Sequence, residues 1–246
     1  MAVKKENFAR YEFKFLLRAE KRIRVENEVK NFMRFDGYCH ESLDNSYYVN
    51  SLYFDDPKGA SFYEKVDGIK TRKKYRIRSY GETYEEGIPI FFEEKVRYNN
   101  RTLKYRIPIL EEHIPLFCDE RKILQVGKYY PGIDFVDRFI YQKLKNRIRP
   151  RVKVLYIRRP YVSDYDMNFR ITFDDSIKGL KTDSIFSHKK DFWKLSAPGY
   201  TILEVKFFRR IPAWFHRILQ KNNLERVSIS KFCLGMEATG QELDLS

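Results

Sequence analysis

The 246 residues, 43% of them hydrophobic, allow one large β-rich domain over residues 1–246, and no linker divides the chain. No apolar run approaches the roughly 20 residues of a membrane span, and the start lacks a signal-peptide core, so we expect a cytoplasmic protein whose membrane links, if any, need a partner subunit. The net charge of +14 predicts an anionic partner, which could be nucleic acid, an anionic membrane or a polyphosphate.

The first half of the chain predicts mainly strands. A helix over Arg18–Phe35, with an imperfect apolar stripe, follows the first strand. Asp55-Asp56-Pro57 signals a turn, and Asn99-Asn100 fits a tight hairpin turn. The strands expected here are Tyr11–Leu17, Tyr47–Phe54, Lys73–Tyr80, Ile90–Tyr98 and Thr102–Leu110.

The second half predicts two helices and then strands again. The helices are expected over Glu111–Lys128 and Phe135–Arg147. A long excursion over Asp174–Gly199 follows the next two strands, and Pro212 opens a last helix over Ala213–Lys221. The strands expected here are Arg151–Tyr161, Phe169–Phe173 and Tyr200–Phe207. Three widely spaced cysteines, Cys39, Cys118 and Cys233, predict buried thiols in a reducing compartment.

Seven of the predicted strands alternate apolar and charged residues. Tyr75 and Ile77, for example, alternate with Arg76 and Arg78. Because successive strand side chains point to opposite faces, each such strand has one ionic face. An antiparallel sheet with one solvated face would give the same pattern. Here, however, Lys and Arg outnumber the carboxylates, which favours a curved or closed sheet whose polar face converges on an anion.

Eight motifs of the chain, in their order, are similar to those of a known family. The motifs are Arg10-Tyr11-Glu12-Phe13-Lys14, Tyr75-Arg76-Ile77-Arg78-Ser79-Tyr80-Gly81, Phe92-Glu93-Glu94-Lys95, Thr102-Leu103-Lys104, Tyr156-Ile157-Arg158, Phe169-Arg170-Ile171-Thr172-Phe173-Asp174, Ile202-Leu203-Glu204-Val205-Lys206-Phe207 and Ser228-Ile229-Ser230-Lys231-Phe232. From Phe8 to Gly235 the chain resembles the VTC (vacuolar transporter chaperone) domain, the polyphosphate polymerase branch of the CYTH-like triphosphate tunnel metalloenzymes. The resemblance implies an α+β fold, an antiparallel β-barrel with a basic tunnel for tri- or polyphosphate and helices packed outside.

The resemblance also implies roles for individual residues. The catalytic positions are Lys14, Arg76, Arg78, Lys95, Arg158 and Lys231. The substrate-binding positions are Lys104, Tyr156, Arg170, Lys206 and Ser230. Glu204 matches the family's metal-binding carboxylate, which implies Mn²⁺ or Mg²⁺ as cofactor. The residues alone favour a structural ion pair for Glu204, and only the match to the family reverses that preference.

The activity implied by the resemblance is ATP-dependent polyphosphate synthesis. The γ-phosphoryl group of ATP would pass to a growing polyphosphate chain, so the expected partners are ATP and inorganic polyphosphate. Two alternatives stay open, a metal-dependent tri- or polyphosphate hydrolase and a non-catalytic polyphosphate- or nucleotide-binding module. Nucleic acid is not expected, because the aromatic residues alternate with the charges and so point into the core.

One departure from the wider superfamily limits the activity. Arg10 stands where the superfamily has the first glutamate of Glu-x-Glu-x-Lys, and Glu12 and Lys14 occupy the other two positions. The loss of that glutamate speaks against a tunnel triphosphatase or a class IV adenylate cyclase, which use clustered glutamates for metal. We also expect a stand-alone form, because nothing in the sequence matches the regulatory domain and membrane helices of the eukaryotic polymerases.

Overall fold

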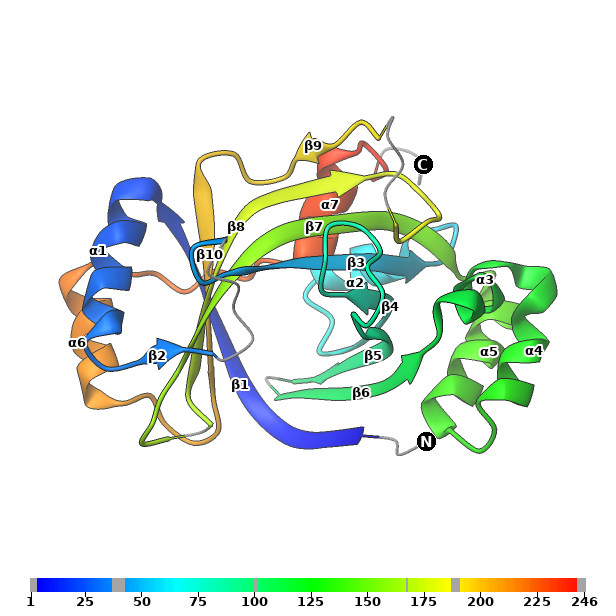
Figure 1. Ribbon diagram of the computed structural model, residues 1–246, viewed down its shortest axis with the longest axis horizontal. Coiled ribbons are helices and arrows are strands. Elements are labelled where there is room, and N and C mark those ends of the chain that lie inside the picture. Colours follow the sequence, from blue (N-terminus) through cyan, green and yellow to red (C-terminus); the bar gives the residue numbers. More distant parts are fainter. Residues whose placement is uncertain (1–3, 37–42, 100, 167, 187–190, 243–246) are drawn as a thin grey trace.

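A computed structural model describes residues 4–36, 43–99, 101–166, 168–186 and 191–242. Its ten strands form one antiparallel sheet in the order β2-β7-β3-β4-β5-β6-β1-β10-β8-β9. Because β7 also pairs with β8, eight of the strands close into a ring (Figure 1). The strands are β1 (Lys4–Arg18), β2 (Arg34–Phe35), β3 (Tyr47–Asp55), β4 (Thr71–Ser79), β5 (Ile90–Tyr98), β6 (Arg101–Ile109), β7 (Arg149–Val162), β8 (Arg170–Leu180), β9 (Lys194–Leu195) and β10 (Tyr200–Phe207).

The expected closed antiparallel sheet is confirmed, although the ring is less regular than a barrel. The pairing register shifts in β1–β6, β3–β7 and β7–β8, and such irregularities bend strands. The predicted excursion over Asp174–Gly199 is wrong in its first part, because β8 continues to Leu180. The hairpin between β5 and β6 is present, with Asn99 in the left-handed conformation, while Asn100 lies outside the described residues.

Two of the four predicted helices are present within one residue of the expected bounds, over Asp134–Asn146 and Ala213–Lys221, and the other two are shorter or broken. The helix expected over Glu111–Lys128 is broken because Asp119 adopts an extended conformation and its side chain caps the next turn. The helix expected over Arg18–Phe35 ends at Lys30. The α-helices are α1 (Ala19–Lys30), α2 (Ala60–Val66), α3 (Ile114–Cys118), α4 (Ile123–Tyr129), α5 (Asp134–Asn146), α6 (Ala213–Lys221) and α7 (Lys231–Ala238), and the 3-10 turns are η2 (Glu111–His113) and η3 (Glu120–Lys122).

The apolar faces of the strands point outward and are covered by helices. On one side, Phe54, Phe92 and other apolar residues of β3 to β6 pack against α3, α4 and α5. On the other side, apolar residues of β1, β7, β8 and β10, such as Phe173, pack against α1 and α6. Burial of each large apolar side chain contributes about 1.5–3 kcal/mol, so these two layers fix the ring. The charged faces of the same strands are left facing inward.

Helix α7 is the exception, because it packs on the inner face of the ring. A Cβ atom at Gly235 would lie 2.7 Å from Val154 and 3.2 Å from Val152, two residues of the inner face of β7. A Cβ atom at Gly179 of β8 would lie 3.0 Å from the Cα atom of Gly235. Only glycine therefore permits this close approach, and α7 fills one end of the interior with apolar side chains such as Met236.

Candidate functional site

The inward faces of the ring line a cavity of about 390 Å³. Two carboxylates, Glu12 and Glu204, are present among its lining residues. The walls also carry twelve cationic side chains, which are Lys14, Lys65, Arg72, Lys74, Arg76, Arg78, Lys95, Arg97, Arg158, Lys206, Arg226 and Lys231. Such an excess of cations in one cavity favours a ligand with several negative charges.

Strand β4 shows how the sequence builds this wall. Its inward positions are Arg72, Lys74, Arg76 and Arg78, and all four line the cavity. Of the residues between them, Tyr75 and Ile77 are buried in the outer core, and Lys73 is exposed. At about 3.3 Å per residue, the four cations extend over roughly 20 Å of wall.

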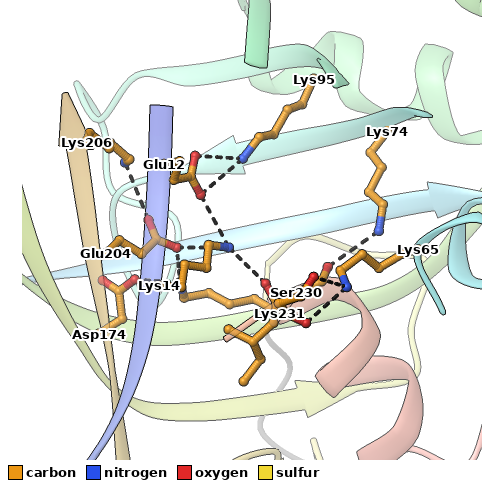
Figure 2. Close-up of polar contacts among 12 residues, drawn as sticks. Glu12, Lys14, Lys65, Lys74, Lys95, Asp174, Glu204, Lys206, Ser230 and Lys231 are labelled. Atoms are coloured by element: carbon orange, nitrogen blue, oxygen red, sulfur yellow. Dashed lines mark hydrogen bonds and ion pairs between the residues drawn. The ribbon is translucent and has the colours of Figure 1, made fainter. Parts of the chain in front are cut away.

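Glu204 of β10 lies at the centre of an ion-pair cluster (Figure 2). Its Oε1 atom lies 2.6 Å from Nζ of Lys231 and 3.4 Å from Nζ of Lys14. Its Oε2 atom lies 3.1 Å from Nη2 of Arg158 and 3.5 Å from Nζ of Lys206. Burial alone would raise the pKa of Glu204, but these cations lower it well below its usual range. The carboxylate is therefore ionised and holds four cations at the cavity wall.

A second carboxylate, Asp174 of β8, supports two of these cations from behind the wall. Arg158 donates two hydrogen bonds of 2.7 Å to its two oxygens, and Lys231 lies 2.5 Å from Oδ2. The Asp174 side chain is fully buried and does not line the cavity. A bidentate pair of this kind fixes the plane of a guanidinium group. Asp174 therefore orients Arg158 and Lys231 toward the interior.

Two further carboxylates, Glu93 behind the wall on β5 and Glu12 at the cavity on β1, also pair with cations. Oε2 of Glu93 lies 2.6 Å from Nη2 of Arg76, and Oε1 of Glu93 lies 2.9 Å from Nζ of Lys104. Glu12 lies 3.1 Å from Nζ of Lys95. Burial would raise the pKa of both carboxylates, but their cationic neighbours lower it well below the usual range.

Arg78 contacts neutral groups, whereas the cations described above are ion-paired with carboxylates. Its Nε atom donates to Oγ of Ser51 at 3.1 Å, and Nη2 donates to the hydroxyl of Tyr156 at 3.4 Å. In the described part of the chain, no carboxylate lies within ion-pair distance of it. Its side chain is 7% exposed, so its charge is largely desolvated. An arriving phosphate group would therefore gain most from Arg78.

Besides Lys74, whose pKa burial lowers to about 8, two lining residues have a pKa close to neutrality. Burial lowers the pKa of Lys206 to about 7, and the attraction of Glu204 offsets only part of that effect. Burial would raise the pKa of Tyr53, but Arg76 and Arg78 lower it to about 8. Arg76 also donates a 3.1 Å hydrogen bond to the Tyr53 hydroxyl. Both groups can therefore change charge when an anion enters.

The cavity brings together ten of the twelve site residues expected from the sequence. Lys104 faces the same interior but ends on Glu93, and Arg170 is exposed at the start of β8, outside the lining. The ten lining residues are Lys14, Arg76, Arg78, Lys95, Tyr156, Arg158, Glu204, Lys206, Ser230 and Lys231.

The motif around Lys231 does not form a strand. The alternation in Ser228-Ile229-Ser230-Lys231-Phe232 imitates a strand, but residues 224–230 are irregular and Lys231 begins α7. The irregular segment is fixed to the ring, because Val227 donates its N–H to the Lys14 carbonyl and Lys14 donates to the Ile229 carbonyl. The start of α7 thereby lies at the cavity wall.

Several lining residues had no assigned role in the sequence. Arg72 and Lys74 continue the two-residue period of Arg76 and Arg78, so extending that period toward the N-terminus would have found them. Lys65 lies on a short helix and Arg226 on an irregular segment, where no period is available. The others are Glu12, Tyr53, Arg97, Thr102, Val227, Ser228, Ile229 and Phe232.

The donor set fits a divalent cation that binds together with phosphate. Among the described residues, no group of three or more His, Cys, Asp or Glu side chains could hold a metal. Glu12 and Glu204 nevertheless lie 3.3 and 3.4 Å from the same atom, Nζ of Lys14. Mg²⁺ and Mn²⁺ prefer oxygen ligands and are often held by one or two carboxylates plus substrate phosphates. These two carboxylates could contribute such ligands if phosphate draws Lys14 away from them.

Other expectations concern cysteines and membrane spans. Cys118 and Cys233 are free thiols, of which Cys233 is buried and Cys118 half-buried, while Cys39 lies outside the described residues. Among the described helices, none combines the length and apolar character needed to cross a membrane.

Comparison with known proteins gave one matching family and solved structures with a similar fold. The VTC domain model matches residues 9–239. A putative adenylate cyclase from Bacillus halodurans superposes with a TM-score of 0.53 and 12% identity, covering 91% of this chain and 94% of that one. A putative adenylyl cyclase from Hippeastrum, described as having a dominant triphosphatase activity, gives 0.51 and 11%, covering 93% and 95%. No curated relative matches the chain. At these identities, the structures show a shared fold.

Proposed function

The chain belongs to the VTC domain family, and on that premise we propose that it is an ATP-dependent polyphosphate polymerase. The observation that carries the proposal is the cavity itself, where twelve cations face the interior with two carboxylates. Arg suits bidentate contact with phosphoryl oxygens, while Lys acts as a mobile point charge. A mixture of both can hold a phosphate chain and still let it move.

The proposed reaction is transfer of the γ-phosphoryl group of ATP. An oxygen of the terminal phosphate of the chain forms a bond to the γ-phosphorus, and the bond from that phosphorus to the β–γ bridging oxygen breaks. ADP leaves with the electron pair, and the chain is longer by one phosphate. The attacking oxygen is already ionised at neutral pH, so the step requires no general base. Arg78, Arg158 and Lys231 would neutralise the charge on the transferred group.

The ion pairs support this role because they hold the cations in place before substrate arrives. Asp174 fixes Arg158 and Lys231 from behind, and Glu204 contacts the same two side chains from the cavity. When phosphate oxygens enter, these cations can keep their contact with Asp174 while they bind substrate. Preorganised charges of this kind stabilise a transition state without reorganisation during the reaction.

We propose Mg²⁺ or Mn²⁺ as the cofactor, with Glu204 and Glu12 as its protein ligands. The bound ion would supply further neutralisation of the phosphate oxygens of ATP. Metal binding by these two carboxylates would require the Lys14 ammonium group to leave its position between them and to turn toward phosphate.

Incubation of the purified protein with ATP and either Mn²⁺ or Mg²⁺ tests the proposal. ADP and long phosphate chains, resolved on a gel, are the expected products. ADP with orthophosphate alone would identify a hydrolase, and unchanged ATP would indicate a binding module. The variant Arg158→Ala should abolish synthesis, whereas the matched surface variant Lys122→Ala with Lys128→Ala, outside the cavity, should not.

A further inference from the structure

Eleven of the twelve cations of the cavity divide into two groups by their partners, and the twelfth, Arg97, which donates to the Asn99 carbonyl at 2.8 Å, is in neither group. The inner basic group consists of Lys14, Arg76, Arg78, Lys95, Arg158, Lys206 and Lys231, all of which except Arg78 are ion-paired with a carboxylate. The outer basic group consists of Lys65, Arg72, Lys74 and Arg226. In the described part of the chain, none of these four is ion-paired with a carboxylate. The outer end of the cavity is therefore more positive than the inner end.

The outer cations contact neutral groups instead. Lys65 donates to the carbonyl of Ser228 at 3.0 Å and to its hydroxyl at 2.9 Å. Lys74 donates to the Ser230 hydroxyl at 3.4 Å, and both lysines point toward the segment that precedes α7 (Figure 2). The Arg72 guanidinium donates to the Glu64 carbonyl at 3.2 Å. Because hydrogen bonds to an ionised acceptor are stronger, a phosphate oxygen could replace these neutral partners.

Arg226, a residue of that segment, is the fourth member of the group. Its guanidinium carbon lies 4.1 Å from the centre of the Phe13 ring, and its side chain is exposed. The cation–π contact leaves its hydrogen-bond donors directed elsewhere.

Strand pairing brings like charges together at this end. Lys74 of β4 lies directly opposite Lys95 of β5, which in turn lies opposite Lys104 of β6. Arg72 lies directly opposite Arg97. Like charges placed opposite one another destabilise a sheet. Burial and these neighbours also lower the pKa of Arg72, and burial lowers the pKa of Lys74 to about 8. A polyanion bound along the wall would relieve this repulsion.

We propose that the outer basic group binds the polyphosphate chain beyond its reacting end, so that product leaves the cavity past Lys65, Arg72, Lys74 and Arg226. The inference rests on the proposed function, and it adds a binding site and a direction for the chain. Arg72 and Lys74 continue the inner row of Arg76 and Arg78 along one strand, so a linear anion can follow β4 without a break.

The choice of a phosphate chain follows from what else could occupy this end. In the proposed function, the inner basic group binds the three phosphates of ATP. An adenosine group projecting outward would be neutral and would gain little from four cations. A further length of polyphosphate gains a charge-assisted contact at each of them.

Binding to the full chain tests the inference independently of synthesis. The affinities of tripolyphosphate and of long-chain inorganic polyphosphate are measured for the wild type, for Lys65→Ala with Lys74→Ala, and for the control Lys122→Ala with Lys128→Ala. Loss of two charge-assisted contacts should weaken long-chain binding at least about tenfold. Tripolyphosphate affinity should fall less than about fivefold, by loss of distant charge alone. The control should match the wild type for both ligands.

Two results would overturn the inference. One is an equal fractional loss of affinity for tripolyphosphate and for the long chain in the double variant. The other is a single-stranded DNA oligomer that binds as tightly as long polyphosphate and loses as much in the variant, since the outer group would then be a nucleic-acid surface. A thermal melt of the double variant shows whether it is folded, and Lys65→Gln with Lys74→Gln provides a second test with similar side-chain volume. Failure of ATP-dependent synthesis in the wild type would exclude the proposed function. The binding measurements would still test whether the outer basic group binds long polyphosphate.

Discussion

The Nζ atom of Lys231, the first residue of α7, lies 2.6 Å from Oε1 of Glu204 in β10. Both side chains are almost fully buried, at 6% and 7% exposure. Lys231 owes its position to α7, and α7 owes its position to the contact of Gly235 with β7 and β8. Core packing on the inner face therefore determines where a cation of the cavity lies.

The variant Glu204→Gln should be both inactive and less stable. Replacing the carboxylate by an amide removes the negative charge shared by four cations, which are Lys14, Arg158, Lys206 and Lys231. Breaking a buried pair typically costs 3–5 kcal/mol, so the free energy of unfolding should fall by about that amount. Thermal unfolding measures the loss, and added tripolyphosphate should restore much of it. A Tm equal to the wild type without phosphate would contradict this account of the ion-pair cluster.

The variant Asp174→Asn tests positioning without removing a cavity-lining group. The amide keeps the shape of the side chain but cannot accept from Arg158 and Lys231 with both oxygens. Misplacement of both cations should lower kcat by about 100-fold. The KM for ATP should change less, because Arg78 and the other wall cations stay in place. Steady-state kinetics separate the two constants, and a change confined to KM would show that Asp174 serves binding alone.

The variant Gly235→Ala should destabilise the protein, although alanine is the better helix former. The new Cβ atom would lie 2.7 Å from Val154, so helix or strand must shift at a cost of about 1–3 kcal/mol. Gly127→Ala on α4 is the matched control, because its Cβ atom would meet Ile140 at an ordinary 3.6 Å. That control should gain up to about 1 kcal/mol. Denaturant unfolding compares them, and stabilisation by both substitutions would refute the close packing of α7.

Binding of long polyphosphate should weaken as pH rises through about 8. Burial lowers the pKa of Lys74 to that value, and the charged or titratable groups facing it are Cys233 of α7, Tyr53 and Asp55 of β3, and Arg72. A bound anion raises the pKa, so the complex takes up a proton that the free protein lacks above pH 8. In the free protein, Lys74 binds fewer protons than in the unfolded chain between pH 8 and 10.5, so its contribution to stability rises across that window. Titrations with Lys74→Ala isolate the effect, and an identical pH profile in the variant would exclude Lys74 as its source.

The sequence predicted which face of each strand is charged, and it did so because a strand has a strict two-residue period. Arg76, Arg78 and Arg158 were assigned to the interior on that ground, and the structure places them there. The period says nothing about partners, since strand order and register decide them. Asp174 pairs with Arg158 and Lys231 because the fold brings β7, β8 and α7 together. These elements are far apart in the chain, so a local pattern does not predict the contact.

The parts that the sequence did not predict lie outside periodic segments. Helix α7 has eight residues and includes Gly235, a poor helix former whose presence is explained only by contact with Val154. Lys65 reaches the cavity from α2, which has seven residues. Such a short helix has no extended apolar stripe from which the sequence would predict it. In both cases tertiary packing, which a local pattern does not contain, determines the position of a functional side chain.

Phosphate groups are expected to bind at the inner end of the cavity, with Arg78 as a direct contact. Calorimetric titration with tripolyphosphate at low and high salt tests it most directly, using Arg78→Ala and the surface control Lys122→Ala with Lys128→Ala. Truncating one partner of a buried charged contact costs 2–5 kcal/mol, so Arg78→Ala should weaken binding at least about thirtyfold at both salt concentrations. The control should bind like the wild type. Equal losses in both variants that disappear at high salt would mean that the protein attracts polyanions through diffuse surface charge, and the account would be wrong.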